Sequence, residues 1–277
     1  MSAWLDELRR ALDAAAGPVD FFFRDDDAGW CDGRLFALLD LFERRGLPMD
    51  VAAIPRAMTA PLAAELRSRV AAAPERVGVH QHGFAHLNHE PEGRKCEFGP
   101  ARSSELQRRD IESGRRLLAE VHGLAASDIF TPPWNRCTEA TGEALRASGF
   151  GVLSRDATAR PLGVAGLYEL PVRVDWFARR KGVRLSPGEL GVSLAEAARD
   201  AATPVGVMFH HELMDEAELA RAGELLALLA AHPAARCQLM SPLAQSRRRQ
   251  TAPPHAAREC DPLREPAVAT STPAVRS

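Results

Sequence analysis

Histidines are concentrated in one short stretch of the chain. Four of the nine, His80, His82, His86 and His89, lie within ten positions, directly after the short apolar run at 77–79. Imidazole is the commonest metal ligand in proteins, so clustered histidines at the end of a buried strand indicate a metal site. The alternative is a solvated loop that is rich in histidine, and a carboxylate delivered to the same place would favour the metal.

Three adjacent aspartates are the candidate source of that carboxylate. Asp25, Asp26 and Asp27 follow an apolar and aromatic run at 19–23. Neighbouring negative charges repel one another and cost stability without a cation. The alternative is an acidic run before the helix predicted over 32–45, but Asp32 is already available there as the N-cap.

The spacing of the residues predicts a particular kind of metal chemistry. His82 and His86 are four positions apart, so they face the same side of a helical turn and can also chelate from a tight loop. Glu does not follow His82, so this is not the His-Glu-x-x-His motif of zinc proteases. A catalytic zinc takes three protein ligands and keeps an open position for water. We expect the third ligand to come from residues 25–27.

The same clusters supply candidates for proton transfer. If one aspartate binds the ion, its neighbour can act as the general base toward water. His210, at the end of another predicted strand (204–209), is the candidate acid for the leaving group. His211 alternates to the opposite face of that strand, where a packing or supporting role is expected. Trp134 and Trp176 offer flat apolar faces for a sugar ring, although buried tryptophan is more often core.

Strand and helix patterns alternate along most of the chain, roughly seven or eight times, which predicts a parallel α/β sheet as a barrel or a doubly wound sheet. Ligands bind at the carboxyl ends of the strands in both folds. The unusual polar clusters all follow predicted strands, at 25–27, 80–89, 132–135, 175–176 and 210–211. A barrel brings five such ends around one centre most easily. We expect an N-terminal helix over 1–18, a barrel over 19–244, and a disordered tail over 245–277 that is poor in bulky apolar residues.

Composition excludes several other classes of protein. The 277 residues carry a formal net charge of −2, from 35 basic and 37 acidic side chains, so no global field favours nucleic acid or an anionic membrane. No apolar run reaches the roughly twenty residues that span a bilayer. The five cysteines form no CxxC pair, which indicates free thiols in a reducing compartment. The N-terminus lacks a signal-peptide pattern, so a cytoplasmic location is expected.

In order and spacing the chain resembles the polysaccharide deacetylase family (NodB-like, carbohydrate esterase family four). The family's Asp-Asp-Gly motif is similar to Asp26-Asp27-Ala28-Gly29, which implies Asp26 as the base and Asp27 as a metal ligand. Its His-Ser/Thr-x-x-His motif is similar to the segment from His82 to His86 and implies both histidines as ligands. The resemblance covers roughly residues 19–240 and implies a distorted seven-stranded β/α barrel.

Three further motifs are similar over shorter stretches. The family's Arg-x-Pro-aromatic-Gly motif resembles residues 131–135, and its Leu-x-His motif resembles residues 208–210, implying His210 as the acid. Its fourth motif, with Asp and Trp, resembles Asp175-Trp176. The substrate-binding residues expected from these motifs are Pro133, Trp134, Asn135, Asp175 and Trp176.

The chain also departs from the family pattern. An extra residue separates the acid pair from its glycine, so the register within residues 25–27 stays open. The arginine that orients the base in the family is Thr131 here, and Arg24 or Arg136 is the replacement to test. His follows His210 where the family often has Asp, so either histidine could be the acid.

The resemblance implies a metal-dependent hydrolase that removes an N-acetyl group from a sugar or glycan precursor. The alternatives are a hydrolase of the same fold acting on a non-sugar C–N bond, and an inactive barrel that binds a glycan or a partner. Zinc is the expected cofactor, with cobalt, nickel, iron or manganese as alternatives. The expected partner is a small-molecule or glycan substrate, and the sequence does not indicate an oligomeric state.

Overall fold

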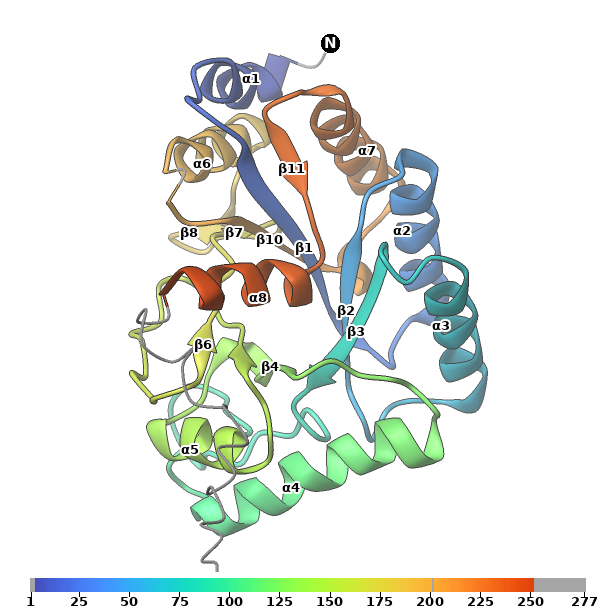
Figure 1. The fold of residues 1–277 in the computed structure, drawn as a ribbon, viewed down its shortest axis with the longest axis vertical. Coiled ribbons are helices and arrows are strands. Elements are labelled where there is room, and N and C mark those ends of the chain that lie inside the picture. The colour runs from blue at the N-terminus through green and yellow to red at the C-terminus, as the bar shows by residue number, and fades with distance from the viewer. Residues whose placement is uncertain (1–2, 201, 252–277) are drawn as a thin grey trace, which may run out of the picture.

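Strand β1 (Val19–Ala28) is the centre of the sheet, because it pairs with three other strands. The computed structural model, drawn in Figure 1, describes residues 3–200 and 202–251. One edge of β1 pairs with β10 (Val205–His210). The other edge pairs first with β11 (Ala235–Cys237) and then with β2 (Met49–Ala53). All three neighbours are parallel to β1, so the carboxyl ends of β1, β2 and β10 lie at one end of the sheet.

The remaining strands extend this sheet on both sides. The order is β6-β5-β4-β3-β2-β1-β10-β7, with β11 paired to β1 outside this path. The other members are β3 (Val77–His82), β4 (Ile129–Thr131), β5 (Val152–Leu153), β6 (Tyr168–Glu169) and β7 (Val174–Asp175). Two short strands, β8 (Arg179–Arg180) and β9 (Val183–Arg184), form a separate antiparallel hairpin.

One extended segment closes the sheet into a barrel. β6 and β7 stand at opposite ends of the strand order, yet they are consecutive parts of residues 168–176. The Leu170 amide donates to the Leu153 carbonyl beside β5, whereas the Arg173 amide donates to the Gly206 carbonyl on β10. The segment therefore leaves one edge of the sheet and joins the other. With β6 and β7 counted as one strand, the barrel has seven parallel strands. The predicted distorted (β/α)7 barrel is confirmed.

Helices surround the strands of the barrel (Figure 1). They are α1 (Asp6–Asp13), α2 (Asp32–Arg45), α3 (Ala60–Ala72), α4 (Ser104–Arg116), α5 (Glu139–Ala147), α6 (Pro187–Arg199), α7 (Glu216–Ala231) and α8 (Met240–Thr251). Short helical turns are η1 (Ala3–Leu5), η2 (Leu117–Val121), η3 (Pro133–Asn135) and η4 (His211–Leu213). Asp32 is the first residue of α2 and not its N-cap, since Cys31 occupies that position.

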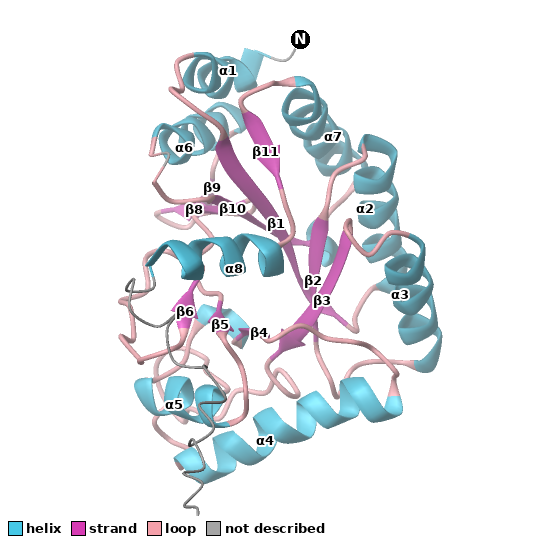
Figure 2. Ribbon diagram, in the orientation of Figure 1, coloured by secondary structure: helices cyan, strands magenta, loops and turns pink. Residues whose placement is uncertain are grey.

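The alternation of side chains along β1 separates two apolar layers. Phe21 and Phe23 belong to the large core between the strands and the outer helices. Phe22 points to the other face, where it packs with Met240 and Leu243 of α8. Figure 2 shows α8 lying across the strands between β1 and β6. This helix closes the barrel at the end where β1 begins, so the carboxyl ends of the strands are left for a site.

The terminal segments fit the predicted boundaries only in part. The Trp4 ring meets the Trp176 ring edge to face, with centroids 6.1 Å apart, so the N-terminal helix shares the core of the barrel. Residues 245–251, predicted as part of the tail, continue α8. Arg247 of that helix pairs with the buried Asp20 on β1 at 3.0 Å. The remainder of the predicted tail, 252–277, lies outside the described residues.

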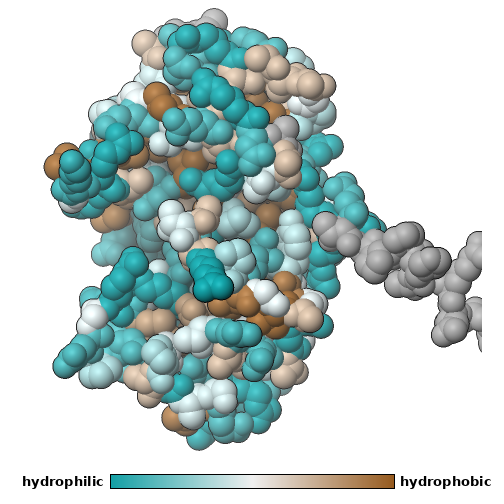
Figure 3. All heavy atoms as spheres, turned by 90° about the vertical axis from the view of Figure 1, so that its left-hand side faces the viewer, coloured by the Kyte–Doolittle hydropathy of each residue, from teal (hydrophilic) through white to brown (hydrophobic). Residues whose placement is uncertain are grey.

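The outer surface agrees with a fold whose apolar side chains face inward. On the face drawn in Figure 3, hydrophilic residues predominate and the apolar ones form scattered patches. Over residues 3–200 and 202–251, every helix is too short or too polar to reach across a lipid bilayer.

A buried carboxyl group anchors α8 to the barrel. Asp50 on β2 is 2% exposed, and its Oδ2 accepts the Met240 amide, the first of α8, at 2.8 Å. Burial raises the pKa of Asp50 to about 7, although this hydrogen bond acts in the opposite direction. Between about pH 4 and pH 7, the Asp50 carboxyl group is therefore protonated in the folded chain and ionised in the unfolded chain.

We predict that Asp50→Asn, which keeps an oxygen for the Met240 amide, removes one pH-dependent component of stability. A raised pKa in the folded state stabilises at low pH, and this stabilisation is lost as pH rises from about 4 to about 7. The free energy of unfolding of the wild type, relative to the variant, should fall by up to about 1.4 kcal/mol per pH unit in that window. Denaturant unfolding of both proteins at pH 4.5, 6 and 8 measures this. A difference that is constant with pH would contradict the assignment.

Candidate metal centre and catalytic site

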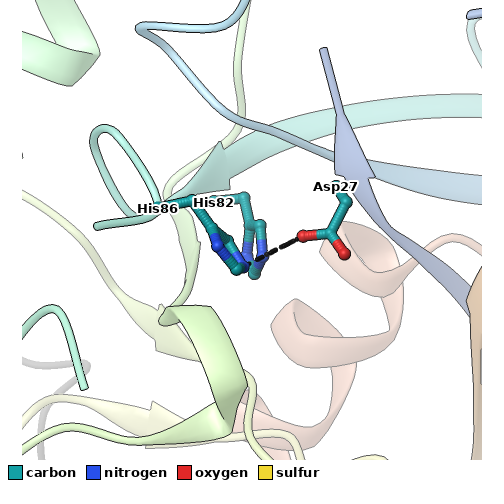
Figure 4. A group of neighbouring side chains, drawn as sticks. All are labelled: Asp27, His82 and His86. Atoms are coloured by element: carbon teal, nitrogen blue, oxygen red, sulfur yellow. Dashed lines mark hydrogen bonds and ion pairs between the residues drawn. The ribbon is translucent and has the colours of Figure 1, made fainter. Parts of the chain in front are cut away.

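Three side chains from two strand ends converge on one point. Oδ1 of Asp27, on β1, lies 3.1 Å from Nε2 of His82, which ends β3. The same oxygen lies 3.1 Å from Nε2 of His86, in the loop after β3. Figure 4 shows both imidazoles pointing at the Asp27 carboxylate. The candidate ligand atoms all lie within 4.8 Å of one another, as the donors around one metal ion do.

The environment of His82 prepares it as a ligand. Its Nδ1 donates to the Thr131 carbonyl oxygen at 3.0 Å, which directs Nε2 at Asp27, where Nε2 carries the proton that a metal ion would replace. Although burial acts in the opposite direction, the hydrogen bonds from His82 and His86 hold the pKa of Asp27 well below its usual range. The carboxylate is therefore ionised, and two nitrogens and one oxygen are a donor set that zinc and several other divalent metals accept.

A buried glutamate shapes the loop between the two histidines. Glu97 is fully buried, and its carboxylate accepts the Phe84 amide at 3.1 Å and the Ala85 amide at 2.8 Å. Gly83 has a φ of +57°, and a Cβ there would lie 2.2 Å from Glu97 Oε2 and 2.5 Å from Pro133 Cδ. Glycine is therefore required at this turn. Glu97 could not be predicted from the sequence, because nothing near the histidines indicates that a residue of the following loop supports them.

Unusual backbone conformations gather around the metal centre. Six non-glycine residues of the described chain have positive φ, and four of them belong to the site: Asp27, His86, Trp134 and Asn135. Such conformations cost about 1–3 kcal/mol each and are characteristic of functional sites. The fold therefore stabilises this arrangement of ligands at the expense of local backbone energy.

The candidate base is held by an arginine from its own strand. Asp26 is 2% exposed, and its two oxygens accept Nε and Nη2 of Arg24 at 2.8 and 2.9 Å. Burial raises the pKa of Asp26, but the charges of Arg24, His82 and His210 together more than offset this and lower it. Arg24 and Arg136 were the two possible replacements for the family's orienting arginine, and Arg24 is the one that contacts Asp26. Arg136 instead donates to the Lys95 carbonyl.

His210 lies opposite the candidate base. It pairs with Asp26 across the β1–β10 ladder, and its charge contributes to the lowered pKa of Asp26. Its Nδ1 is buried without a hydrogen-bond partner among the described residues. Asp175, at the end of β7, is half-buried. Burial raises its pKa, and the nearby charge of His210 acts in the opposite direction. Its Oδ1 accepts the Phe177 amide.

The residues of η3 (Pro133–Asn135) form one side of the candidate metal centre. The centroid of the His86 ring lies 4.4 Å from that of the Trp134 ring and 4.9 Å from that of the Trp30 ring. The amide oxygen of Asn135 accepts Nη2 of Arg24 at 2.7 Å, so Asn135 supports the arginine that holds the base. Pro133 is buried beside Gly83.

Trp176 does not reach this site, which corrects the expectation that it contacts substrate. Its side chain is 2% exposed and packs on Phe209 and Trp4, in the core beneath the helices. Its indole nitrogen donates to Glu218 of α7 at 2.8 Å. The alternation along the strand explains this, since Asp175 and Trp176 must point to opposite faces.

The two remaining neighbours of the catalytic candidates also pair with each other. Asp25 and His211 are fully buried on the helix-facing side, with Oδ2 and Nδ1 2.6 Å apart. Burial alone lowers the pKa of a histidine, but the Asp25 charge and two hydrogen bonds raise that of His211 to about 9. The supporting position expected for His211 is therefore observed, and Asp25 is excluded from the metal centre.

Comparison with known proteins places the fold. No family model and no curated protein sequence matches the chain. A solved structure from Mycobacterium smegmatis, assigned as a polysaccharide deacetylase, matches with a TM-score of 0.66 and 19% identity, over 92% of this chain and 96% of that one. The chain has the fold of the polysaccharide deacetylases. The resemblance expected from the motifs is thus confirmed at the level of fold.

Two further matches show what this fold carries in other proteins. The family 4 acetyl xylan esterase from Clostridium thermocellum, in complex with a cobalt ion, matches with a TM-score of 0.51 and 12% identity, over 82% of this chain and 91% of that one. A mutant of BA3943, a family 4 pseudoenzyme with restored enzymatic activity, matches with a TM-score of 0.51 and 13% identity, over 83% and 68%. The fold therefore occurs with and without activity, and only the site residues can argue for catalysis.

We predict that Glu97→Ala lowers the affinity for a divalent metal ion about 10- to 100-fold, the range typical of residues that support metal ligands. The substitution removes the acceptor of two loop amides and frees His86 from its position. Glu92→Ala, at an exposed position of the following loop, is the matched control and should bind as the wild type does. Titration with Co²⁺, followed by its visible absorption, measures the affinities. Equal affinity of the two variants would contradict the role of Glu97.

Proposed function

We propose that this chain is a metal-dependent hydrolase that removes an N-acetyl group from a sugar or glycan precursor. The observation that carries the proposal is the joint placement of the Asp27–His82–His86 centre, the ionised Asp26 and His210 at the same end of the barrel. The first provides a ligand set, and the other two provide a base and an acid on adjacent strands.

The proposed ligands are Asp27, His82 and His86, and their donor atoms fit a small divalent cation. When bound, such a cation supplies Lewis-acid polarisation of a carbonyl oxygen and lowers the pKa of water. Zinc agrees with this donor set, and cobalt, nickel, iron and manganese remain alternatives. The Thr131 carbonyl holds His82, and Glu97 holds the loop that carries His86, so these two ligands require little rearrangement to bind an ion.

The residues of the chain divide the proton transfers between them. Asp26 is ionised and accepts a proton from the attacking water as general base. Arg24 fixes both carboxylate oxygens of Asp26, so the base keeps one orientation while it is buried. His210 donates a proton to the departing amine nitrogen, which makes it a neutral leaving group. Asp175 lies near His210 and is proposed to assist it.

The proposal of a sugar substrate rests on the aromatic side chains of the site. Trp30 is 37% exposed and Trp134 is half-buried, and both lie against the His86 ring. Indole faces beside a polar centre suit the apolar faces of a sugar ring. Two structural relatives, named as a polysaccharide deacetylase and an acetyl xylan esterase, agree with this choice. Pro133 and Asn135 are proposed to shape the same wall, while Trp176 is left out of the substrate site.

We predict that purified wild-type protein contains a divalent metal and releases acetate from at least one N-acetylated sugar. Asp27→Ala and His86→Ala should lose both the metal and the activity, because each removes a ligand. His89→Ala is the matched control, since this exposed histidine belongs to the same sequence cluster and lies outside the centre. Elemental analysis and acetate release over a panel of N-acetylated sugars measure the two properties.

The proton-transfer roles have a different expected pattern. Asp26→Asn and His210→Gln should keep the metal and lose about 10²–10⁴-fold in turnover, as expected for a general base or acid. Cleavage of other amides with no activity on any sugar would indicate a hydrolase of a non-sugar C–N bond. A metal-loaded protein that cleaves neither class would contradict the enzymatic proposal and favour an inactive binding barrel.

A further inference from the structure

The pair formed by Asp25 and His211 occupies the back of the catalytic site. Both side chains are 0% exposed, and they lie on the helix-facing side of the barrel, away from the metal centre. They are the sequence neighbours of the candidate base and acid, since Asp25 precedes Asp26 and His211 follows His210. These two residues are also the part of the acidic run and of the histidine pair for which the proposed reaction gives no role.

The hydrogen bonds of the pair connect three segments of the chain. The backbone amide of His211 donates to Asp25 Oδ1 at 2.9 Å, and Asp25 Oδ2 lies 2.6 Å from His211 Nδ1. On the other side of the ring, Nε2 donates to the Trp30 carbonyl oxygen at 2.6 Å. The contacts join the end of β1, the start of η4, and the turn after β1. The imidazole cannot turn over without losing two hydrogen bonds.

Each contact fixes a residue of the site. Asp25 holds the backbone amide that follows His210, and so determines where β10 ends and how His210 is directed. The hydrogen bond to Trp30 holds the far end of the turn that starts at Asp27, in which the Trp30 amide donates to the Asp27 carbonyl at 3.2 Å. Asp26 and His210 are paired across the same two strands. The Asp25–His211 pair is thus a brace that contacts the segments carrying the proposed base, the proposed acid and the metal-ligating carboxylate.

We propose that Asp25 and His211 are positioning residues that set the spacing between Asp26, Asp27 and His210 from behind the sheet. This inference rests on the proposed function for the roles of those three residues. It predicts that the pair matters for metal affinity and for turnover through geometry, and not through the charge of Asp25.

Two substitutions at the same position separate geometry from charge. Asp25→Ala removes every contact of the brace. Asp25→Asn keeps an oxygen for the His211 amide, and its side-chain NH₂ can donate to Nδ1 of a neutral ring that still donates from Nε2 to Trp30. Asp20→Asn is the matched control, because this aspartate is also buried and ion-paired on β1, at the opposite end of the strand.

The experiment measures Co²⁺ affinity by absorption titration, and then kcat and KM at saturating metal, on the full chain. For Asp25→Ala we expect metal affinity to fall about 10- to 100-fold, and kcat to fall by a similar factor with KM little changed. Asp25→Asn should restore both to within about fivefold of the wild type. Asp20→Asn should lower the melting temperature and leave affinity and kcat unchanged.

Several outcomes would overturn the inference. Wild-type affinity and kcat in folded Asp25→Ala would show that the pair serves stability alone. Equal defects in Asp25→Asn and Asp25→Ala would assign the effect to charge. If the wild type releases no acetate from any substrate, the proposed function fails. The affinity titration still decides the brace in that case, because it needs no turnover.

Discussion

The burial of three consecutive aspartates is the constraint on which this site depends. Ionised neighbours cannot be buried together unless each faces a separate positive or hydrogen-bonding group. The chain meets this requirement by sending the three side chains in different directions. Asp25 points to the helix side and meets His211, and Asp26 points into the barrel and meets Arg24. Asp27, with its φ of +72°, turns toward the two histidines of the metal centre.

The barrel brings the products of this local solution together with the histidines. Parallel pairing places the carboxyl ends of β1, β3 and β10 at one end of the molecule, so the proposed base, the two candidate imidazole ligands and the proposed acid meet without long loops. The opposite end is closed by α8, whose first amide is held by Asp50. The segment at 168–176 completes the ring of strands. The end away from α8 carries the Asp27–His82–His86 group, Asp26 and His210.

Much of this could be predicted from the sequence, because alternation of short apolar strands with helices indicates a parallel barrel and the polar clusters mark strand ends. Residue type and spacing indicated His82 and His86 together with one carboxylate from residues 25–27, and the family resemblance implied that this carboxylate is Asp27. The placement of Trp176 and the support from Glu97 did not. The first depends on which face of a two-residue strand is buried, and the second on a contact between loops that no local pattern encodes. The resemblance could not say which way the Asp25 side chain points. That direction depends on the register of β1, which the motif alone does not give.

Anomalous diffraction from crystals of the full chain grown with Zn²⁺ or Co²⁺ would locate a bound metal ion. We expect one strong peak at the carboxyl end of the barrel, about 2.0–2.2 Å from an Asp27 oxygen and from Nε2 of both His82 and His86. At least one further coordination position should be open to solvent. A peak bound elsewhere, or an ion held by the histidines with Asp27 turned away, would contradict the assignment of these three ligands.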